Sequence, residues 1–268
     1  MISNAKREAR ELDLGLNGRT AIICASSKGL GKACAIALAA EGADVIVNGR
    51  DSETLLAAVA EIAAVAKGKV IPIVADLTTV EGRARLLEPI PQPDILVTNC
   101  GGPPFGNFRN FNRTDWLSAL EGNMLSAIDL IKGVIDPMIL RRHGRIVNIT
   151  SVAVKAPIAE LCLSNGARSG LTGFVAGLAR EVSHASVTIN NILPGTFATD
   201  RILEQARHAA AGITVDEQLA IWKAQEVSGR MGRPHELGAL CAFLCSEHAG
   251  YITGQNILMD GGGYPGTF

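Results

Sequence analysis

Residues 19–50, RTAIICASSKGLGKACAIALAAEGADVIVNGR, contain the pattern that decides the fold of this chain. The apolar run TAIIC ends in small residues and leads into a turn that contains two glycines. An alanine-rich stretch follows, stops at Gly42, and precedes a second apolar run, DVIVNG. Short apolar runs bounded by turn signals predict buried strands, and the stretch between them predicts a helix. The segment therefore predicts a strand–helix–strand unit with parallel strands.

The same alternation continues along the rest of the chain. Further strands are expected in residues 69–77, 93–102, 145–151, 187–195 and 254–262. Helices are expected in residues 52–68, 113–140 and 163–182, with Ser52 as the N-cap of the first. The strands are continuously apolar, which is typical of a sheet covered on both faces. We therefore expect the α/β class, with a doubly wound parallel sheet of about seven strands.

The ends and one internal stretch of the chain do not fit this alternation. Residues 1–15 are polar and predict a helical extension, so that the main domain covers residues 16–268 as a single unit. Residues near 198–230 are rich in helix-forming side chains and predict a helical insertion. In a doubly wound fold such an insertion can form a lid over the carboxyl ends of the strands, where ligands bind.

Composition excludes several classes of function. Charged residues make up 19% of the chain and the net charge is −1, which gives no reason to expect nucleic acid or a membrane as partner. The N-terminus lacks the apolar core of a signal peptide, and no apolar run is long enough to span a bilayer. The six cysteines show no CxxC spacing, so we expect buried thiols and no metal site. We expect a cytoplasmic protein with a small-molecule substrate.

Five short motifs follow strands of the predicted sheet. They are CASSKGLG (24–31), ADLT (75–78), TNCGG (98–102), PGTFATD (194–200) and MDGG (259–262). In this order they resemble the motifs of the short-chain dehydrogenase/reductase family, and within it the 3-oxoacyl-carrier-protein reductase-like members. The resemblance covers residues 16–262 and implies a Rossmann-type fold. It also implies an oxidoreductase that acts on a CH–OH or C=O group and that assembles as a homotetramer or homodimer.

The resemblance also implies a nicotinamide dinucleotide as cofactor. The positions that match the family's cofactor-binding motifs are Ala25, Ser27, Lys28, Gly29, Leu30, Gly31, Arg50, Asp76, Leu77, Asn99, Gly101, Arg168, Pro194, Gly195 and Thr199. Members that take NAD usually carry an aspartate where this chain has Gly49. Arg50 and Lys28 instead supply cations that suit a 2′-phosphate, so we expect NADP(H). The alternative is that both are ordinary solvated surface cations.

Ala25 stands where the family usually has the first glycine of the turn. An L-residue is disfavoured at positive φ, so we expect Ala25 to adopt an ordinary negative φ. A positive φ at this position would count against a cofactor site. We further expect backbone N–H groups of the turn to face the cofactor pyrophosphate.

The proposed catalytic positions depart from the family pattern. Ser151 matches the serine that bonds the substrate carbonyl, although it could instead cap the following turn. Asn123 matches the helix asparagine that holds a proton-relay water. Counting on from Ser151 places Ser164 and Arg168 where the family has tyrosine and lysine, four residues apart on one helix face. Serine is a weak acid and arginine stays protonated, so the usual proton delivery is expected to be lost.

Two hypotheses follow from this substitution. The first is an NADP-dependent oxidoreductase that reduces a carbonyl or related group on a small, largely apolar substrate with an atypical proton source. That source is either an ordered water held by Ser151, Ser164 and Asn123, or an acidic group of the substrate. The second is a non-catalytic NADP-binding protein, acting as a sensor or a partner subunit. Ile158, Leu161, Cys162 and Phe197 suggest an apolar substrate pocket but are equally suited to the core.

Overall fold

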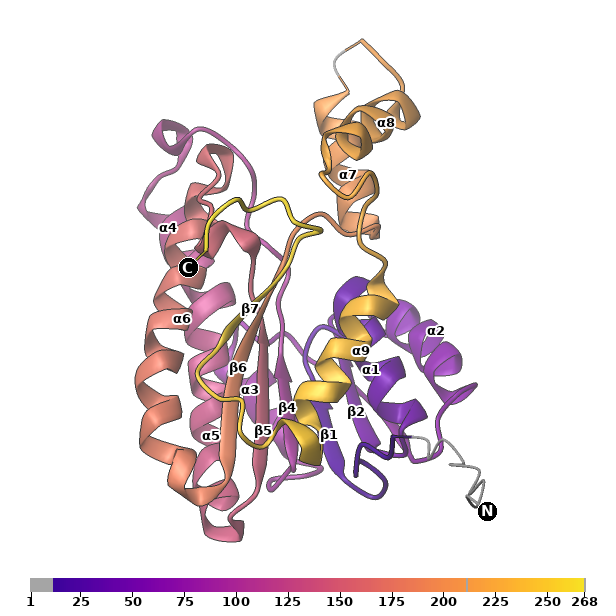
Figure 1. Ribbon diagram of the computed structural model, residues 1–268, viewed down its shortest axis with the longest axis vertical. Coiled ribbons are helices and arrows are strands. Elements are labelled where there is room, and N and C mark those ends of the chain that lie inside the picture. Colours follow the sequence, from indigo (N-terminus) through magenta and orange to yellow (C-terminus); the bar gives the residue numbers. More distant parts are fainter. Residues whose placement is uncertain (1–11, 211, 268) are drawn as a thin grey trace, which may run out of the picture.

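A single parallel sheet forms the centre of the molecule. The computed structural model describes residues 12–210 and 212–267, and within them seven strands pair in the order β3-β2-β1-β4-β5-β6-β7 (Figure 1). The strands are β1 (Thr20–Ile23), β2 (Asp44–Gly49), β3 (Val70–Val74), β4 (Ile95–Thr98), β5 (Gly144–Ile149), β6 (Val187–Pro194) and β7 (Asn256–Met259). All six pairings are parallel, which confirms the predicted doubly wound α/β fold.

Helices cover both faces of the sheet. One face carries α1 (Gly29–Ala40), α2 (Ser52–Ala63) and α9 (Pro234–Cys245). The other carries α3 (Val80–Leu87), α5 (Ser126–Arg141) and α6 (Cys162–Val182), with α4 (Arg113–Leu120) packed on α6. The remaining short helices are η1 (Phe108–Asn110), η2 (Glu121–Leu125), η3 (Val152–Val154), η4 (Ala159–Leu161), η5 (Ser183–Ala185) and η6 (Glu247–Ala249).

The two layers bury two separate hydrophobic clusters. Successive residues of a strand face opposite sides, so Ile23 and Val45 contact the α1 side while Ile22 and Ile46 contact the α5 side. All four are fully buried. This explains why the strands read as unbroken apolar runs in the sequence.

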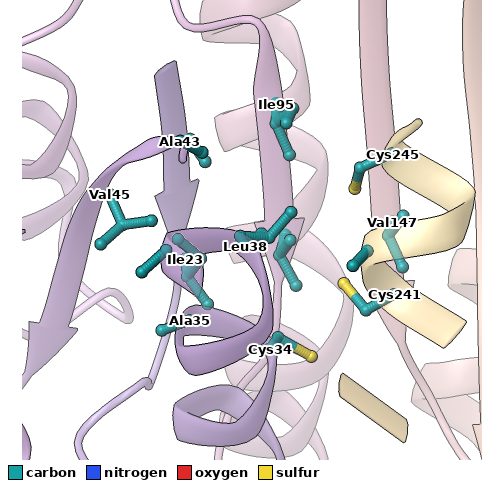
Figure 2. Close-up of a cluster of buried hydrophobic side chains, with 14 of the residues drawn as sticks. Ile23, Cys34, Ala35, Leu38, Ala43, Val45, Ile95, Val147, Cys241 and Cys245 are labelled. Carbon is teal, nitrogen blue, oxygen red and sulfur yellow. The ribbon is translucent and has the colours of Figure 1, made fainter. Parts of the chain in front are cut away.

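Three of the cysteines lie inside the first cluster. Cys34 on α1 and both Cys241 and Cys245 on α9 point between the helices and the sheet (Figure 2). The hydrogen bond with Cys245 lowers the pKa of Cys241, but the hydrogen bond with Cys34 and burial outweigh it and hold that pKa well above the usual value. For Cys245, the hydrogen bond with Cys241 and burial both raise the pKa. These residues act as small buried side chains, as predicted, and no group of three or more His, Cys, Asp or Glu within residues 12–210 and 212–267 could hold a metal ion.

The predicted insertion forms two helices beyond the carboxyl ends of the strands. They are α7 (Asp200–Ala209) and α8 (Val215–Gln225), drawn in orange in Figure 1. A capping box between Thr214 and Glu217 starts α8. A bridge between Phe197 and Gly232 joins the segments that lead into and out of the pair. The lid therefore has a fixed base on the sheet side.

Two details of the second helix differ from the prediction. Asp51, not Ser52, caps α2, because its Oδ1 accepts hydrogen bonds from the Thr54 N–H at 2.8 Å and the Thr54 hydroxyl at 2.6 Å. The helix ends at Ala63, before Gly68. Gly68 instead lets its segment pass close to the residue before β2, since a Cβ at Gly68 would lie 2.7 Å from the carbonyl oxygen of Ala43.

The long helix predicted for residues 113–140 is not continuous. A π-helical turn, η2, separates α4 from α5. Such turns insert one extra residue into a helix and are frequent at functional sites. The predicted N-terminal helix lies mostly outside the described residues, since residues 1–11 are not among them.

Candidate functional site

The predicted site residues gather at the carboxyl ends of the central strands. The strand order reverses between β1 and β4, and ligands of doubly wound sheets bind beyond the strand ends at such a point. Across the neighbouring strands, a ladder of side-chain hydrogen bonds of 2.6, 3.0 and 2.8 Å links Thr98, Asn148, Asn191 and Asn256, of which the first three are buried. This ladder ties β4, β5, β6 and β7 together just below the site.

The turn after β1 has a glycine-like shape at a residue that is not glycine. Ala25 has a φ of 45°, so the predicted negative φ is wrong. Its N–H donates to Asn48 Oδ1 at 3.2 Å, and its carbonyl accepts from Asn99 Nδ2 at 3.4 Å. Contacts on both sides thus hold the residue in a conformation that costs an L-residue about 1–2 kcal/mol.

The positive φ does not close the turn. Ala25 takes the backbone shape that the usual glycine would take, and a Cβ on Gly31 would collide with its carbonyl oxygen. The first turn of α1 therefore approaches the end of β1 as closely as the motif requires. The condition stated above as counting against a cofactor site, a positive φ at Ala25, is therefore met, although the close approach of Gly31 to Ala25 is kept.

Replacing Ala25 with glycine should stabilise the protein. Glycine removes the left-handed strain but adds chain entropy to the unfolded state, for a net gain of roughly 0.5–1 kcal/mol in the free energy of unfolding. Urea denaturation of both proteins measures this difference. Ala40→Gly, in the last turn of α1, is the matched control and should destabilise by a similar amount. A destabilised Ala25→Gly variant would contradict the strain assigned to Ala25.

The N-terminus of α1 is left open for an anion. Lys28 is its N-cap residue but makes no side-chain capping bond, and no acidic residue lies in the first turn. The helices α2, α4 and α8 are capped by Asp51, Asn112 and Thr214. The free N–H groups of Gly29, Leu30 and Gly31 and the helix dipole favour a negative group at α1.

The ends of β2 and β3 carry the next predicted residues. Ser27 packs on Gly49, where a Cβ would lie 3.0 Å from its Oγ. Arg50 is exposed and lies near enough to Asp76 to help lower the pKa of that carboxyl, whose main cause is the hydrogen bond from the Thr78 N–H. One carboxylate oxygen of Asp76 thus accepts a hydrogen bond within the loop that follows β3 and stabilises that loop.

The loops after β4 and β6 hold the remaining cofactor positions. Asn99 reaches back to the turn at Ala25, whereas Gly101 has open space where a side chain would stand. Gly195 lies against Asp260, whose Cα is 2.9 Å from where a Cβ would be. Pro194 ends β6, and Thr199 precedes α7 close to Gly29. Leu77 is buried near the end of β3. The structure thus brings every predicted cofactor residue to one edge of the sheet.

Arg168 and Ser164 form one hydrogen-bonded unit on α6. Arg168 Nε donates to Ser164 Oγ at 3.1 Å, and Nη1 donates to the carbonyl oxygen of Ile149 at 2.8 Å. Both side chains are buried, at 8% and 5% exposure. Burial lowers the pKa of Arg168 to about 10, so the guanidinium stays charged at neutral pH. Ser164 Oγ acts here as an acceptor and keeps its own proton for another partner.

Asn123 lies in the π-helical turn η2 and faces the same region. Its Nδ2 donates to the carbonyl oxygen of Ala119 at 3.4 Å, while Oδ1 is buried with no partner among the described residues. A cavity of about 10 Å³ brings Asn123, Asn99, Cys100 and Arg168 together. That volume suits about one water molecule.

Ser151 follows β5, two residues after Ile149, which lines the same cavity. Its Oγ accepts a hydrogen bond from the Ala153 N–H at 3.1 Å and so caps η3. The structural role considered from the sequence is therefore real, but it leaves the hydroxyl proton free. Cys100, a position that motif comparison treats as a departure, also lines the cavity beside Arg168.

The four residues suggested for an apolar substrate pocket or for the core differ in burial. Ile158 is exposed, and Leu161 and Cys162 are half-buried. Phe197 is 6% exposed and packs in the first hydrophobic cluster, so it is a core residue, the alternative given above. Phe197 also borders a larger cavity of about 190 Å³ beside residues 226–236. That cavity contains none of the predicted catalytic or cofactor residues, so we place the candidate site at the smaller one.

Comparison with known proteins agrees with the motif order. A family model described as enoyl-(acyl carrier protein) reductase matches residues 24–263. The 3-oxoacyl-[acyl-carrier-protein] reductase FabG of Vibrio cholerae is 32% identical over 94% of this chain and 99% of its own length. None of the described helices is both long and apolar enough to cross a bilayer.

Solved structures show the same arrangement. L-sorbose reductase from Gluconobacter frateurii, in complex with NADPH and L-sorbose, matches with a TM-score of 0.89 and 27% identity, over 93% of this chain and 98% of that one. A 3-oxoacyl (acyl-carrier-protein) reductase from Agrobacterium tumefaciens with NADP bound matches with a TM-score of 0.85 and 27% identity, over 97% and 100%. This chain belongs to the short-chain dehydrogenase/reductase family, and its relatives are of the 3-oxoacyl-[acyl-carrier-protein] reductase type.

Proposed function

We propose that this protein is an NADP-dependent reductase that acts on the carbonyl group of a small molecule. The observation that carries the proposal is the Arg168–Ser164 pair, a buried cation that donates to a hydroxyl at 3.1 Å. The relatives named above are reductases, and two of the matching structures contain NADPH or NADP. When bound, the cofactor supplies a hydride to the carbonyl carbon.

The residues of the turn after β1 and of β2 support NADP(H) as the cofactor. The uncapped N-terminus of α1 suits the pyrophosphate, because its free N–H groups and dipole attract an anion. Arg50 and Lys28 are exposed cations beside Ser27, and Gly49 brings no carboxylate to this end of β2. A guanidinium can bind a phosphate through two parallel hydrogen bonds. We therefore assign Ser27, Lys28 and Arg50 to the 2′-phosphate.

Two hydroxyl groups are suited to bind the substrate oxygen. The Oγ atoms of Ser151 and Ser164 both accept hydrogen bonds from within the protein, at 3.1 Å in each case, so each can donate its own proton outward. Negative charge develops on the carbonyl oxygen as hydride arrives, and fixed donors stabilise it. The Arg168 cation behind Ser164 adds to this stabilisation in a buried, low-dielectric setting.

The final proton comes from a weaker source than the family's tyrosine. Neither serine nor a charged guanidinium is a strong general acid at neutral pH. The buried Oδ1 of Asn123 can accept from a water in the small cavity next to Arg168. We assign proton delivery to this water, or to an acidic group of the substrate itself. Turnover of simple ketones should therefore be slow.

NADPH oxidation measured against a panel of ketones, enals and quinones tests the proposal. Turnover of any of them, dependent on Ser151 and Ser164, supports it. NADPH binding without turnover on the whole panel would instead favour a non-catalytic NADP-binding protein, such as a sensor or partner subunit. Absence of NADPH binding in a calorimetric titration would contradict both.

A further inference from the structure

Arg201, in the first turn of the lid helix α7, is fixed against the loop that follows β4. Its Nη1 donates to the carbonyl oxygen of Gly102 at 3.1 Å, and Nη2 donates to that of Pro103 at 3.2 Å. Gly102 allows this contact, since a Cβ there would lie 2.5 Å from Nη2. The guanidinium also lies 5.4 Å from the centre of the Phe105 ring. It is therefore held in one place at the mouth of the candidate site.

Arg201 and Arg168 place two cations close together with little to balance them. The charge of Arg201 contributes to lowering the pKa of Arg168, after burial as the main cause, so the two guanidiniums lie within electrostatic reach. Neither forms an ion pair with a carboxylate among the described residues. The acidic group that acts on Arg201 is Glu204, further along α7, beyond ion-pair distance.

Arg83 shows how this chain balances a buried arginine elsewhere. It is 8% exposed and pairs with Glu121 and Asp129, each at 2.8 Å. Of the two cations, Arg168 is buried without a carboxylate partner in the described part of the chain, which is costly, whereas Arg201 is exposed to solvent. Two like charges close together add to the cost at Arg168. The hydrogen bonds of Arg201 to backbone carbonyl groups hold helix α7 in place but do not neutralise the positive charge. An anionic ligand at the mouth would supply the missing charge.

We propose that Arg201, with Arg168 behind it, binds a carboxylate of the substrate. This inference rests on the reductase function proposed above and names the substrate class as an oxo acid. Phe105, next to Arg201, is 44% exposed. Its loop is joined through the Gly106 N–H to the carbonyl oxygen of Glu160 at 2.9 Å, two residues from Ile158, which is 39% exposed. The ligand that fits is therefore an oxo acid with an apolar chain, held at its carboxylate by the lid.

Calorimetric titration of the NADPH-loaded protein with 2-oxohexanoate and with its methyl ester tests this inference. The acid should bind more tightly than the ester to the wild-type protein. Arg201→Gln should weaken binding of the acid by about tenfold, which corresponds to one charge-assisted hydrogen bond at a partly exposed site. It should change the affinity for the ester little. Arg207→Gln, an exposed cation on the same helix, is the control and should leave both unchanged.

A second variant keeps the charge but moves it. Gly102→Ala introduces a Cβ against the Arg201 guanidinium, so the side chain must shift, and acid binding should fall as it does in Arg201→Gln. Equal binding of acid and ester by the wild type overturns the inference. A loss of NADPH affinity in Arg201→Gln, as large as the loss for the acid, also overturns it and assigns Arg201 to a cofactor phosphate.

The same measurements separate this inference from the proposed function. Turnover of acid and ester with equal KM values would leave the reductase function intact and reject the carboxylate site. Tight, Arg201-dependent binding of the acid without NADPH oxidation would support the carboxylate site and reject the reductase function.

Discussion

Replacing Arg50 with alanine is expected to weaken NADPH binding by about 10- to 100-fold while NADH binding stays nearly unchanged. The two cofactors differ by one phosphate, and Arg50 is the exposed guanidinium that follows Gly49 at the end of β2. No carboxylate among the described residues pairs with Arg50, so its hydrogen-bonding edge is available to a ligand. Each charge-assisted bond to the phosphate is worth roughly 1.5–3 kcal/mol, which sets the expected range.

Fluorescence titration of the wild-type protein and of Arg50→Ala with NADPH and with NADH measures these affinities. Lys32→Ala is the matched control, because Lys32 is a cation of α1 that is already paired with Glu61 at 2.8 Å. It should leave both affinities close to the wild-type values. Equal affinity of the wild-type protein for NADPH and NADH would reject the assignment of Arg50, and the two cations would then be ordinary surface residues.

The sequence predicts the strands well because both their faces are buried. Each β-strand overlaps a predicted apolar run, although the structure ends β1 at Ile23 and β3 at Val74, before the small residues Cys24 and Ala75. Helix interruptions are different. The π-helical turn at residues 121–125 leaves the apolar spacing of residues 113–140 nearly intact, since it shifts the pattern by a single residue. Gly122 and Asn123 lie in this turn, but a single glycine or asparagine is also tolerated within a regular helix, so the interruption could not be predicted from the sequence.

The motifs predict which residues share the site but not how they are held. Ala25 is an example, because its positive φ depends on a hydrogen bond to Asn48 and one from Asn99, which are 23 and 74 residues away in the chain. Propensity alone favours the opposite conformation. Arg201 is a second example, since no motif marks it and its partners Gly102 and Pro103 lie 99 and 98 residues away.

The substituted pair on α6 shows what the structure adds to the motif comparison. From the sequence, Ser164 and Arg168 are simply a missing acid and a missing lysine. In the structure Arg168 also fixes the end of β5, through its hydrogen bond to the Ile149 carbonyl, and orients Ser164. Arginine suits this double task because its planar fork donates in two directions at once, which a lysine does less well. The substitution therefore exchanges acid strength for rigid placement of a hydroxyl group.

The double variant Ser164→Tyr with Arg168→Lys should raise the reduction of a generic ketone by about 10²–10⁴-fold, the range for a positioned general acid. The two side chains lie one helical turn apart on α6, so the phenol and the amine would share one face. Lysine beside tyrosine favours the phenolate and makes the phenol a better acid. Asn123 lines the same cavity as Arg168. Ser151 follows β5, whose last residue Ile149 accepts a hydrogen bond from Arg168.

Comparison of four proteins isolates the effect of the pair: the wild type, Ser164→Tyr, Arg168→Lys and the double variant. NADPH oxidation with small ketones is measured for each, after thermal unfolding and an NADPH titration confirm folding and cofactor binding. Either single change should do less, because tyrosine without lysine is a weaker acid and lysine without tyrosine has no acid to assist. The phenol needs more room than the serine hydroxyl, and Ser164 is only 5% exposed, so the loops above α6 must open for it as they must for a substrate. A double variant that folds, binds NADPH and stays as inactive as the wild type would mean that the pocket has diverged beyond its acid. The non-catalytic function would then be the better account of this protein.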